Sequence, residues 1–156
     1  MLAHVWMQDV HRYLDFLREH FGSGLTSVVL FGSWARGTAL PESDIDLLVV
    51  ASGLPARRSD RHRLLYGIAR RVSGEFASTV APIVATPEEA ARVKPYYLGM
   101  LSGHMMLWDT DGFFGGVLDQ LRRRLTELGA RRYVDDDGYE FWDLKPDWKP
   151  GDVVSL

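Results

Sequence analysis

The chain has 156 residues, of which 46% are hydrophobic and 25% charged, and its net charge is −3. This length can bury one core without covalent staples, and the acidic balance argues against a general nucleic-acid coat protein, which carries a basic excess. The sequence has no cysteine, which excludes disulfides and cysteine-ligated zinc.

Hydrophobic spacing predicts alternating helices and strands in the N-terminal half. Residues 4–21 carry apolar side chains at helical intervals. Leu25–Phe31 is a short apolar, β-branched run typical of a buried strand, and it leads into a turn, residues 34–37, that can open a helix. A second strand is predicted over Asp44–Ala51, whose apolar end is typical of burial on both faces. Residues 58–72 fit an amphipathic helix.

The C-terminal half continues the alternation. Phe76–Ala85 reads as a third strand, in which Pro82 indicates a sheet edge or a bulge. A helix start follows, with Thr86 as N-cap, Pro87 at the first helical position and Glu89 closing a capping box. The remaining predicted elements are a strand over Met105–Trp108, a helix over Gly115–Leu128 and an edge strand over Tyr139–Leu144.

This order predicts an α+β fold, α/β-like, with a mixed central sheet flanked by helices. We expect a single domain over residues 1–156, with the last helix and edge strand as a C-terminal extension. The sequence shows neither a signal-peptide pattern nor an apolar run of membrane-spanning length. We therefore expect a cytoplasmic protein that does not bind membranes.

Two carboxylates mark the start of the second strand. Asp44 and Asp46 are two positions apart, so both project from one face while Ile45 points into the core. Carboxylates this close repel each other unless a cation lies between them. Mg²⁺ takes hard oxygen ligands and accepts substrate phosphates in its remaining positions. The pair therefore predicts a metal-binding, catalytic site at Asp44 and Asp46.

A glycine–serine pair directly follows the first strand. Gly32 lets the backbone approach a ligand that a Cβ atom would exclude, and Ser33 adds a hydroxyl. Backbone amides at a strand-to-helix turn bind phosphate oxygens. Arg36 either neutralises phosphate charge or is a surface charge, and Trp34 either lines the pocket or anchors the turn. We predict nucleotide binding at Gly32, Ser33 and Arg36.

The pattern Gly-Ser, ten residues, Asp-x-Asp resembles the signature of the DNA polymerase β superfamily of nucleotidyltransferases. It is particularly similar to the minimal nucleotidyltransferases, which include antitoxins encoded beside HEPN ribonuclease toxins. The stretch over residues 131–147 also resembles the ending of stand-alone prokaryotic members. The resemblance implies the nucleotidyltransferase fold and Mg²⁺-dependent transfer of a nucleoside monophosphate, AMP from ATP, to a hydroxyl.

The resemblance favours a partner toxin protein of the HEPN type as the acceptor. A small molecule such as an aminoglycoside is the alternative, although drug-modifying relatives carry an additional acceptor domain. Nucleic acid is a less favoured partner, and oligomerisation is compatible with the sequence.

One departure from the family pattern bears on catalysis. The family supplies a third carboxylate from a later strand, but Phe76–Ala85 contains no acid, and Thr79 or Ala81 would occupy the place. Glu75 is the nearest candidate, and we predict it as the third catalytic carboxylate; Glu88 and Asp109 are more remote candidates. If Glu75 does not reach the pair, a second hypothesis gains weight: a nucleotide-binding interaction protein that masks a toxin with weak or no catalysis.

Overall fold

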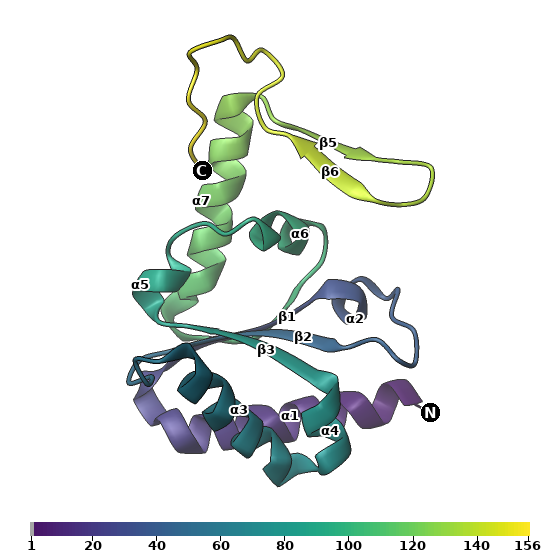
Figure 1. The fold of residues 1–156 in the computed structure, drawn as a ribbon, viewed down its shortest axis with the longest axis vertical. Coiled ribbons are helices and arrows are strands. Elements are labelled where there is room, and N and C mark those ends of the chain that lie inside the picture. Colours follow the sequence, from purple (N-terminus) through teal and green to yellow (C-terminus); the bar gives the residue numbers. More distant parts are fainter. Residues whose placement is uncertain (1) are drawn as a thin grey trace.

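A computed structural model describes residues 2–156, and side chains from residue 6 onward. Its centre is a four-stranded mixed sheet in the order β3-β2-β1-β4 (Figure 1). The central strands β1 and β2 pair antiparallel, β4 is antiparallel to β1, and β3 is parallel to β2. The strands are β1 (Leu25–Phe31), β2 (Ile45–Ala51), β3 (Val80–Ala85) and β4 (Met105–Asp109). The sequence-based expectation of a mixed sheet flanked by helices is confirmed.

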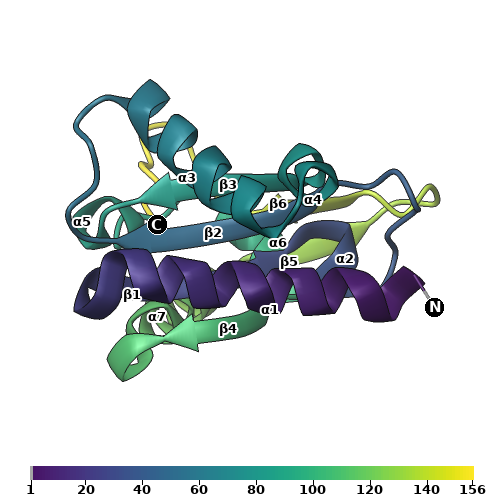
Figure 2. The same ribbon diagram turned by 90° about the horizontal axis from the view of Figure 1, so that it is seen from below.

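Three helices cover one face of this sheet: α1 (Leu2–Phe21), α3 (Arg58–Val72) and α4 (Gly74–Thr79). Figure 2 shows α1 running along the sheet on this side. Leu17 and Leu65 are fully buried here beside Leu47 of β2. Burying each such side chain stabilises the fold by about 1.5–3 kcal/mol. The hydroxyl of buried Tyr13 donates to the carbonyl of Leu65 at 3.3 Å, and burial raises the pKa of that hydroxyl.

The helices on the other face are α5 (Pro87–Ala90), α6 (Tyr96–Ser102) and α7 (Phe113–Leu128). Tyr97, Met100 and Phe114 are fully buried against Leu48 and Val50 of β2. Alternate residues of β2 thus enter opposite cores, as the two-residue period of a strand requires. Short 3₁₀ turns, Gly22–Gly24 and Thr110–Gly112, connect α1 to β1 and β4 to α7.

A hairpin of β5 (Arg131–Val134) and β6 (Glu140–Asp143) forms a separate two-stranded sheet beyond α7 (Figure 1). Trp142 and Leu144 pack partly against the core around α7, whereas the strand faces are mostly exposed. Among the described helices, none combines the length and apolar character that crossing a bilayer demands.

The predicted strand over Phe76–Ala85 is wrong in its first four residues, which belong to helix α4. The side chain of Ser73 caps this helix by accepting the amide of Phe76 at 2.9 Å. The hydroxyls of Ser78 and Thr79 donate back to carbonyls four residues earlier. These local bonds outweigh the strand-like composition, because Ser and Thr side chains can satisfy a short helix.

Other expectations hold with small changes of boundary. Pro82 lies on β3, an edge strand, as predicted. Thr86, Pro87 and Glu89 form the expected capping box and helix start. The helix after the Gly-Ser pair begins at Gly32 itself, forming α2 (Gly32–Arg36). The sequence reading missed α6 and β5.

Candidate functional site

The end of β1 places Gly32 directly against Asp46. Phe31, the last residue of β1, is the register partner of Asp46 on β2. The next residue, Gly32, has a φ of 70° and faces the Asp46 carboxylate so closely that a Cβ atom would collide with Oδ2. Glycine is therefore required here by both backbone conformation and space. The turn leaves its backbone open beside the carboxylate.

Short helix α2 carries Ser33 and Arg36 away from this point. Gly37, with a φ of 73°, ends the helix in the left-handed conformation. The indole of Trp34 donates to the carbonyl of Ser43 at 3.1 Å and lies 4.6 Å from the ring of Trp6. Trp34 thus anchors the turn and the following loop to α1, which is one of the two roles considered for it.

The aspartates and Arg36 form one electrostatic unit. Asp46 is half-buried, and burial raises the pKa of its carboxyl group; the neighbouring negative charge of Asp44 raises it further. Arg36 acts in the opposite direction and lowers the same pKa. Asp44 and Arg36 are exposed. The structure therefore brings together Gly32, Arg36, Asp44 and Asp46, with Ser33 next to Gly32.

This arrangement can bind a metal-bound polyphosphate. Two carboxylates that repel each other favour a divalent cation, and an adjacent glycine turn with an arginine suits phosphate oxygens. The profile of the family described as "Nucleotidyltransferase domain" matches residues 10–94, which include the turn and both aspartates. The chain belongs to this nucleotidyltransferase family.

The nucleotidyltransferase is similar to a predicted protein adenylyltransferase, MJ1305, of Methanocaldococcus jannaschii. The two are 32% identical over 144 residues, which cover 91% of this chain and 92% of the relative. A second predicted protein adenylyltransferase of that organism, MJ0141, is 35% identical over 60 residues, covering 38% of this chain and 59% of the relative.

Solved structures of related folds were also found. A toxin–antitoxin with AMP-PNP has a TM-score of 0.47 and 20% identity, covering 76% of this chain and 91% of its own. A chain in the complex of a tri-AMPylated Shewanella oneidensis HEPN toxin with an MNT antitoxin has a TM-score of 0.44 and 18% identity, and the match covers 80% of this chain and 92% of that one.

The structure places Glu75 apart from Asp46. This residue lies on α4, whose Phe76 and Ala77 enter the core beneath α1 and α3. Glu75 lines a hollow together with Ile45, which points to the opposite side of β2 from Asp46. The placement of Glu75 across the sheet therefore does not support it as the third carboxylate.

Ala81 occupies the place where the strand could offer an acid. It is the register partner of Asp46 on β3, so its side chain lies on the same face. Among the side chains that the structure describes, from residue 6 onward, no three of His, Cys, Asp or Glu gather closely enough to hold a metal ion. The acids that the described side chains place at this site are Asp44 and Asp46.

Two residues that the sequence reading missed complete the surroundings. Gly103, just after α6, packs so closely on Arg36 that a Cβ atom would lie 2.8 Å from Cγ of Arg36. Tyr96 stacks on Phe31 with ring centroids 5.9 Å apart. Gly103 itself was the sequence signal for close packing on Arg36, because helix α6 was not predicted.

Proposed function

We propose that this nucleotidyltransferase transfers AMP from ATP to a side-chain hydroxyl of a partner protein. The hydroxyl oxygen forms a bond to the α-phosphorus, the bond from that phosphorus to the β-phosphate oxygen breaks, and pyrophosphate leaves. The hydroxyl proton passes to solvent or to a carboxylate of the site. The observation that carries this proposal is the Asp46 carboxylate facing the open backbone of Gly32.

The residues present fit a magnesium ion, because burial and then the neighbouring carboxylate of Asp44 raise the pKa of Asp46, and a cation between the two carboxylates would balance their negative charge. A bound Mg²⁺ supplies charge stabilisation for the phosphate oxygens. Asp44 and Asp46 would hold it. The backbone amides at Gly32 and Ser33 would orient the triphosphate, and Arg36 would balance its charge.

The choice of AMP and of a protein acceptor rests on similarity. The relative that matches more than nine-tenths of both chains is named as a protein adenylyltransferase. The resemblance to the antitoxin group favours a HEPN-type toxin as the acceptor. A small-molecule acceptor is less favoured because the described residues build no separate acceptor domain beyond the sheet, its helices and the hairpin.

Ala81 favours a second candidate function. With alanine in place of a third acid beside Asp46, nucleotide binding is retained more readily than proton abstraction from the acceptor. In this case the protein binds and masks its partner without modifying it.

Labelled ATP separates the two functions. The purified chain is incubated with Mg²⁺ and a HEPN-type protein, the proposed acceptor, using ATP labelled at either the α- or the γ-phosphate. AMP transfer puts α-label, but no γ-label, on the partner, and Asp46→Asn removes it. Stable binding of the partner without α-label would support the masking function and contradict the enzyme.

A further inference from the structure

A cavity of about 770 Å³ begins at the nucleotide turn and runs beneath the C-terminal hairpin. Arg36 and Thr38 line one end of it, and Pro95, Leu98 and Gly99 line its side along α6. Because Arg36 lines this cavity and also lowers the pKa of nearby Asp46, the cavity borders the candidate site at Arg36. An acceptor lying in this cavity would reach the site.

The hairpin contributes its turn and strand β6 to the wall of this cavity. Among the described residues, β6 has one strand partner, β5, so its other edge is open. Glu140, Phe141 and Trp142 of this strand line the cavity. Open strand edges are templates for pairing with another chain.

The pairing register shows which backbone groups lie on that edge. The amide of Asp135 donates to the carbonyl of Tyr139 at 2.9 Å, so these two residues form a hydrogen-bonded pair. In an antiparallel ladder such pairs alternate with non-bonded ones. The register pairs Val134 with Glu140 and Arg132 with Trp142. Counting from the bonded pair Asp135 and Tyr139, these are the first and third pairs along the ladder, so both are non-bonded pairs. The backbone N–H and C=O groups of Glu140 and Trp142 therefore point away from β5, toward the open edge.

Side chains hold this edge in place. The hydroxyl of Ser102, at the end of α6, donates to the Glu140 carboxylate at 2.6 Å, and Arg132 adds an ion pair to it at 3.3 Å. Trp142 packs partly against the core around α7. The edge is thus fixed relative to α6, which is the opposite wall of the cavity.

Aromatic side chains accompany the open edge. Tyr139 is 73% exposed and Phe141 53% exposed, although Phe141 stacks on Tyr133 with ring centroids 5.3 Å apart. A two-stranded hairpin is only marginally stable, and a third strand with apolar contacts adds to it. This edge therefore offers both backbone pairing and apolar surface to a partner.

We propose that an extended segment of the acceptor protein pairs with the open edge of β6 as a third strand and lies in this cavity. Main-chain bonds to Glu140 and Trp142 then supply register, and Tyr139 and Phe141 contact an apolar side chain of the segment. One end of the segment reaches Arg36, where the acceptor hydroxyl meets the nucleotide. This proposal rests on the proposed function, since it names how that site receives its acceptor.

Amide hydrogen exchange tests the pairing directly. The probe is the HEPN-type protein of the labelling experiment, added to ¹⁵N-labelled chain. Exchange at the amides of Glu140 and Trp142 is expected to slow at least about tenfold, as for other newly paired strand amides. The amide of Phe141, which faces β5, should change much less. Unchanged exchange at Glu140 and Trp142 with the partner bound would overturn the proposal.

Exposed aromatic variants give a kinetic test. Tyr139→Ser and Phe141→Ser are expected to raise the KM for the acceptor at least about tenfold and to leave ATP affinity unchanged, because the lost contacts lie only along the docking edge. The matched control is Tyr66→Ser, since Tyr66 is 48% exposed on α3. Equal KM values for all three variants and the wild type would contradict the docking edge.

The two proposals fail in different ways. If the HEPN-type protein takes no label yet slows exchange at Glu140 and Trp142, the transfer function fails and the docking edge stands. If it takes label without such protection, the transfer function stands and the docking edge fails. Absence of both label and protection overturns both.

Discussion

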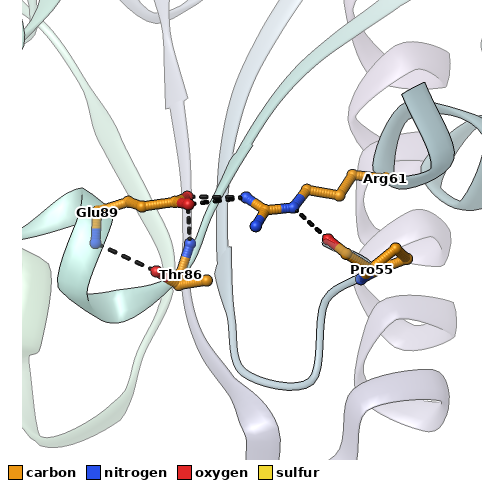
Figure 3. A network of polar contacts seen from close by, with 4 residues as sticks. All are labelled: Pro55, Arg61, Thr86 and Glu89. Atoms are coloured by element: carbon orange, nitrogen blue, oxygen red, sulfur yellow. Dashed lines mark hydrogen bonds and ion pairs between the residues drawn. The ribbon is translucent and has the colours of Figure 1, made fainter. Parts of the chain in front are cut away.

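Two partly buried carboxylates lie in opposite circumstances on this molecule. The Glu89 carboxylate accepts two bonds from buried Arg61, at 2.8 and 3.1 Å, and one from the amide of Thr86 at 3.0 Å (Figure 3). The bond from Arg61, chiefly, holds the pKa of Glu89 below its ordinary value. Asp46 lies beside Asp44 and against Gly32. Burial raises the pKa of Asp46, and the negative charge of Asp44 raises it further.

The difference separates structural from functional charge. Arg61 also donates to the carbonyl of Pro55 at 2.6 Å, so the Glu89 network joins α3, its preceding loop and α5. The charge of Glu89 is thus compensated by groups of the chain itself. Asp46 carries charge that the chain itself leaves poorly compensated, at a place open to a ligand. Perturbed carboxylates of the second kind mark functional sites.

The largest expected effect concerns Asp46. Asp46→Asn should lower AMP transfer by about 10²–10³-fold, because it removes a charge that acts on the reacting phosphate. The melting temperature should not fall, since the substitution relieves repulsion with Asp44. Initial rates with α-labelled ATP measure AMP transfer, and a thermal melt measures the melting temperature. The control is Glu75→Gln, which should keep wild-type transfer; loss in that variant instead would restore Glu75 to the site.

Gly32→Ala comes next. The added Cβ atom collides with Asp46, and the alanine must adopt a φ of 70°. AMP transfer should therefore fall at least about tenfold. The left-handed conformation costs about 1–2 kcal/mol for a residue with a Cβ atom. The matched control is Gly67→Ala on α3, where an added Cβ meets no atom within 4 Å. Chemical denaturation and transfer rates should separate the two variants; similar behaviour would show that the close approach to Asp46 is unimportant.

Glu89→Gln should act on stability and spare transfer. It leaves Arg61 buried without its carboxylate, and we expect a loss of about 1–3 kcal/mol from the free energy of unfolding. Because folding lowers the pKa of Glu89, its contribution is present above the ordinary Glu pKa. The contribution is lost as the pH falls below about 4.3 toward the folded-state value.

Urea denaturation at several pH values tests this dependence. The stability gap between wild type and Glu89→Gln should be full at pH 7 and shrink below the ordinary Glu pKa. A gap that stays constant down to the acid limit would show that the ion pair does not stabilise the fold.

Thr86→Ala should give the smallest effect. It removes the hydroxyl that accepts the Glu89 amide at 3.2 Å, and losing such a cap costs about 1 kcal/mol. Transfer should stay at the wild-type rate, and the melting temperature should fall less than in Glu89→Gln. A larger fall than in Glu89→Gln would mean that the cap, and not the ion pair, holds α5.

Local signals explain what the sequence predicted well. β1 and β2 are continuous apolar runs, and the Gly-Ser turn and Asp44-x-Asp46 pair follow from their positions on them. The structure brings these residues together because Phe31 and Asp46 are neighbours in register. The capping box at Thr86 was likewise readable because it involves four consecutive residues.

The features that the sequence did not reveal depend on tertiary position. Proximity in sequence suggested Glu75, but only the fold shows that α4 lies across the sheet from Asp46. Strand β5 is exposed and half arginine, and its pairing with β6 is visible only through the hairpin. The Asp137-Gly138 dipeptide between these strands was an available hairpin signal.

The central claim is that Asp44, Asp46 and the Gly32 turn hold a metal-bound triphosphate, and Mn²⁺ tests it most directly. Mn²⁺ and a non-hydrolysable ATP analogue are added in substoichiometric amounts to ¹⁵N-labelled chain, and paramagnetic broadening of amide signals is recorded. We predict that the signals of Gly32, Ser33 and Asp46 disappear first while that of Glu75, across the sheet, persists. Broadening centred on Glu75 and α4, with the Gly32 and Asp46 signals sharp, would contradict the account.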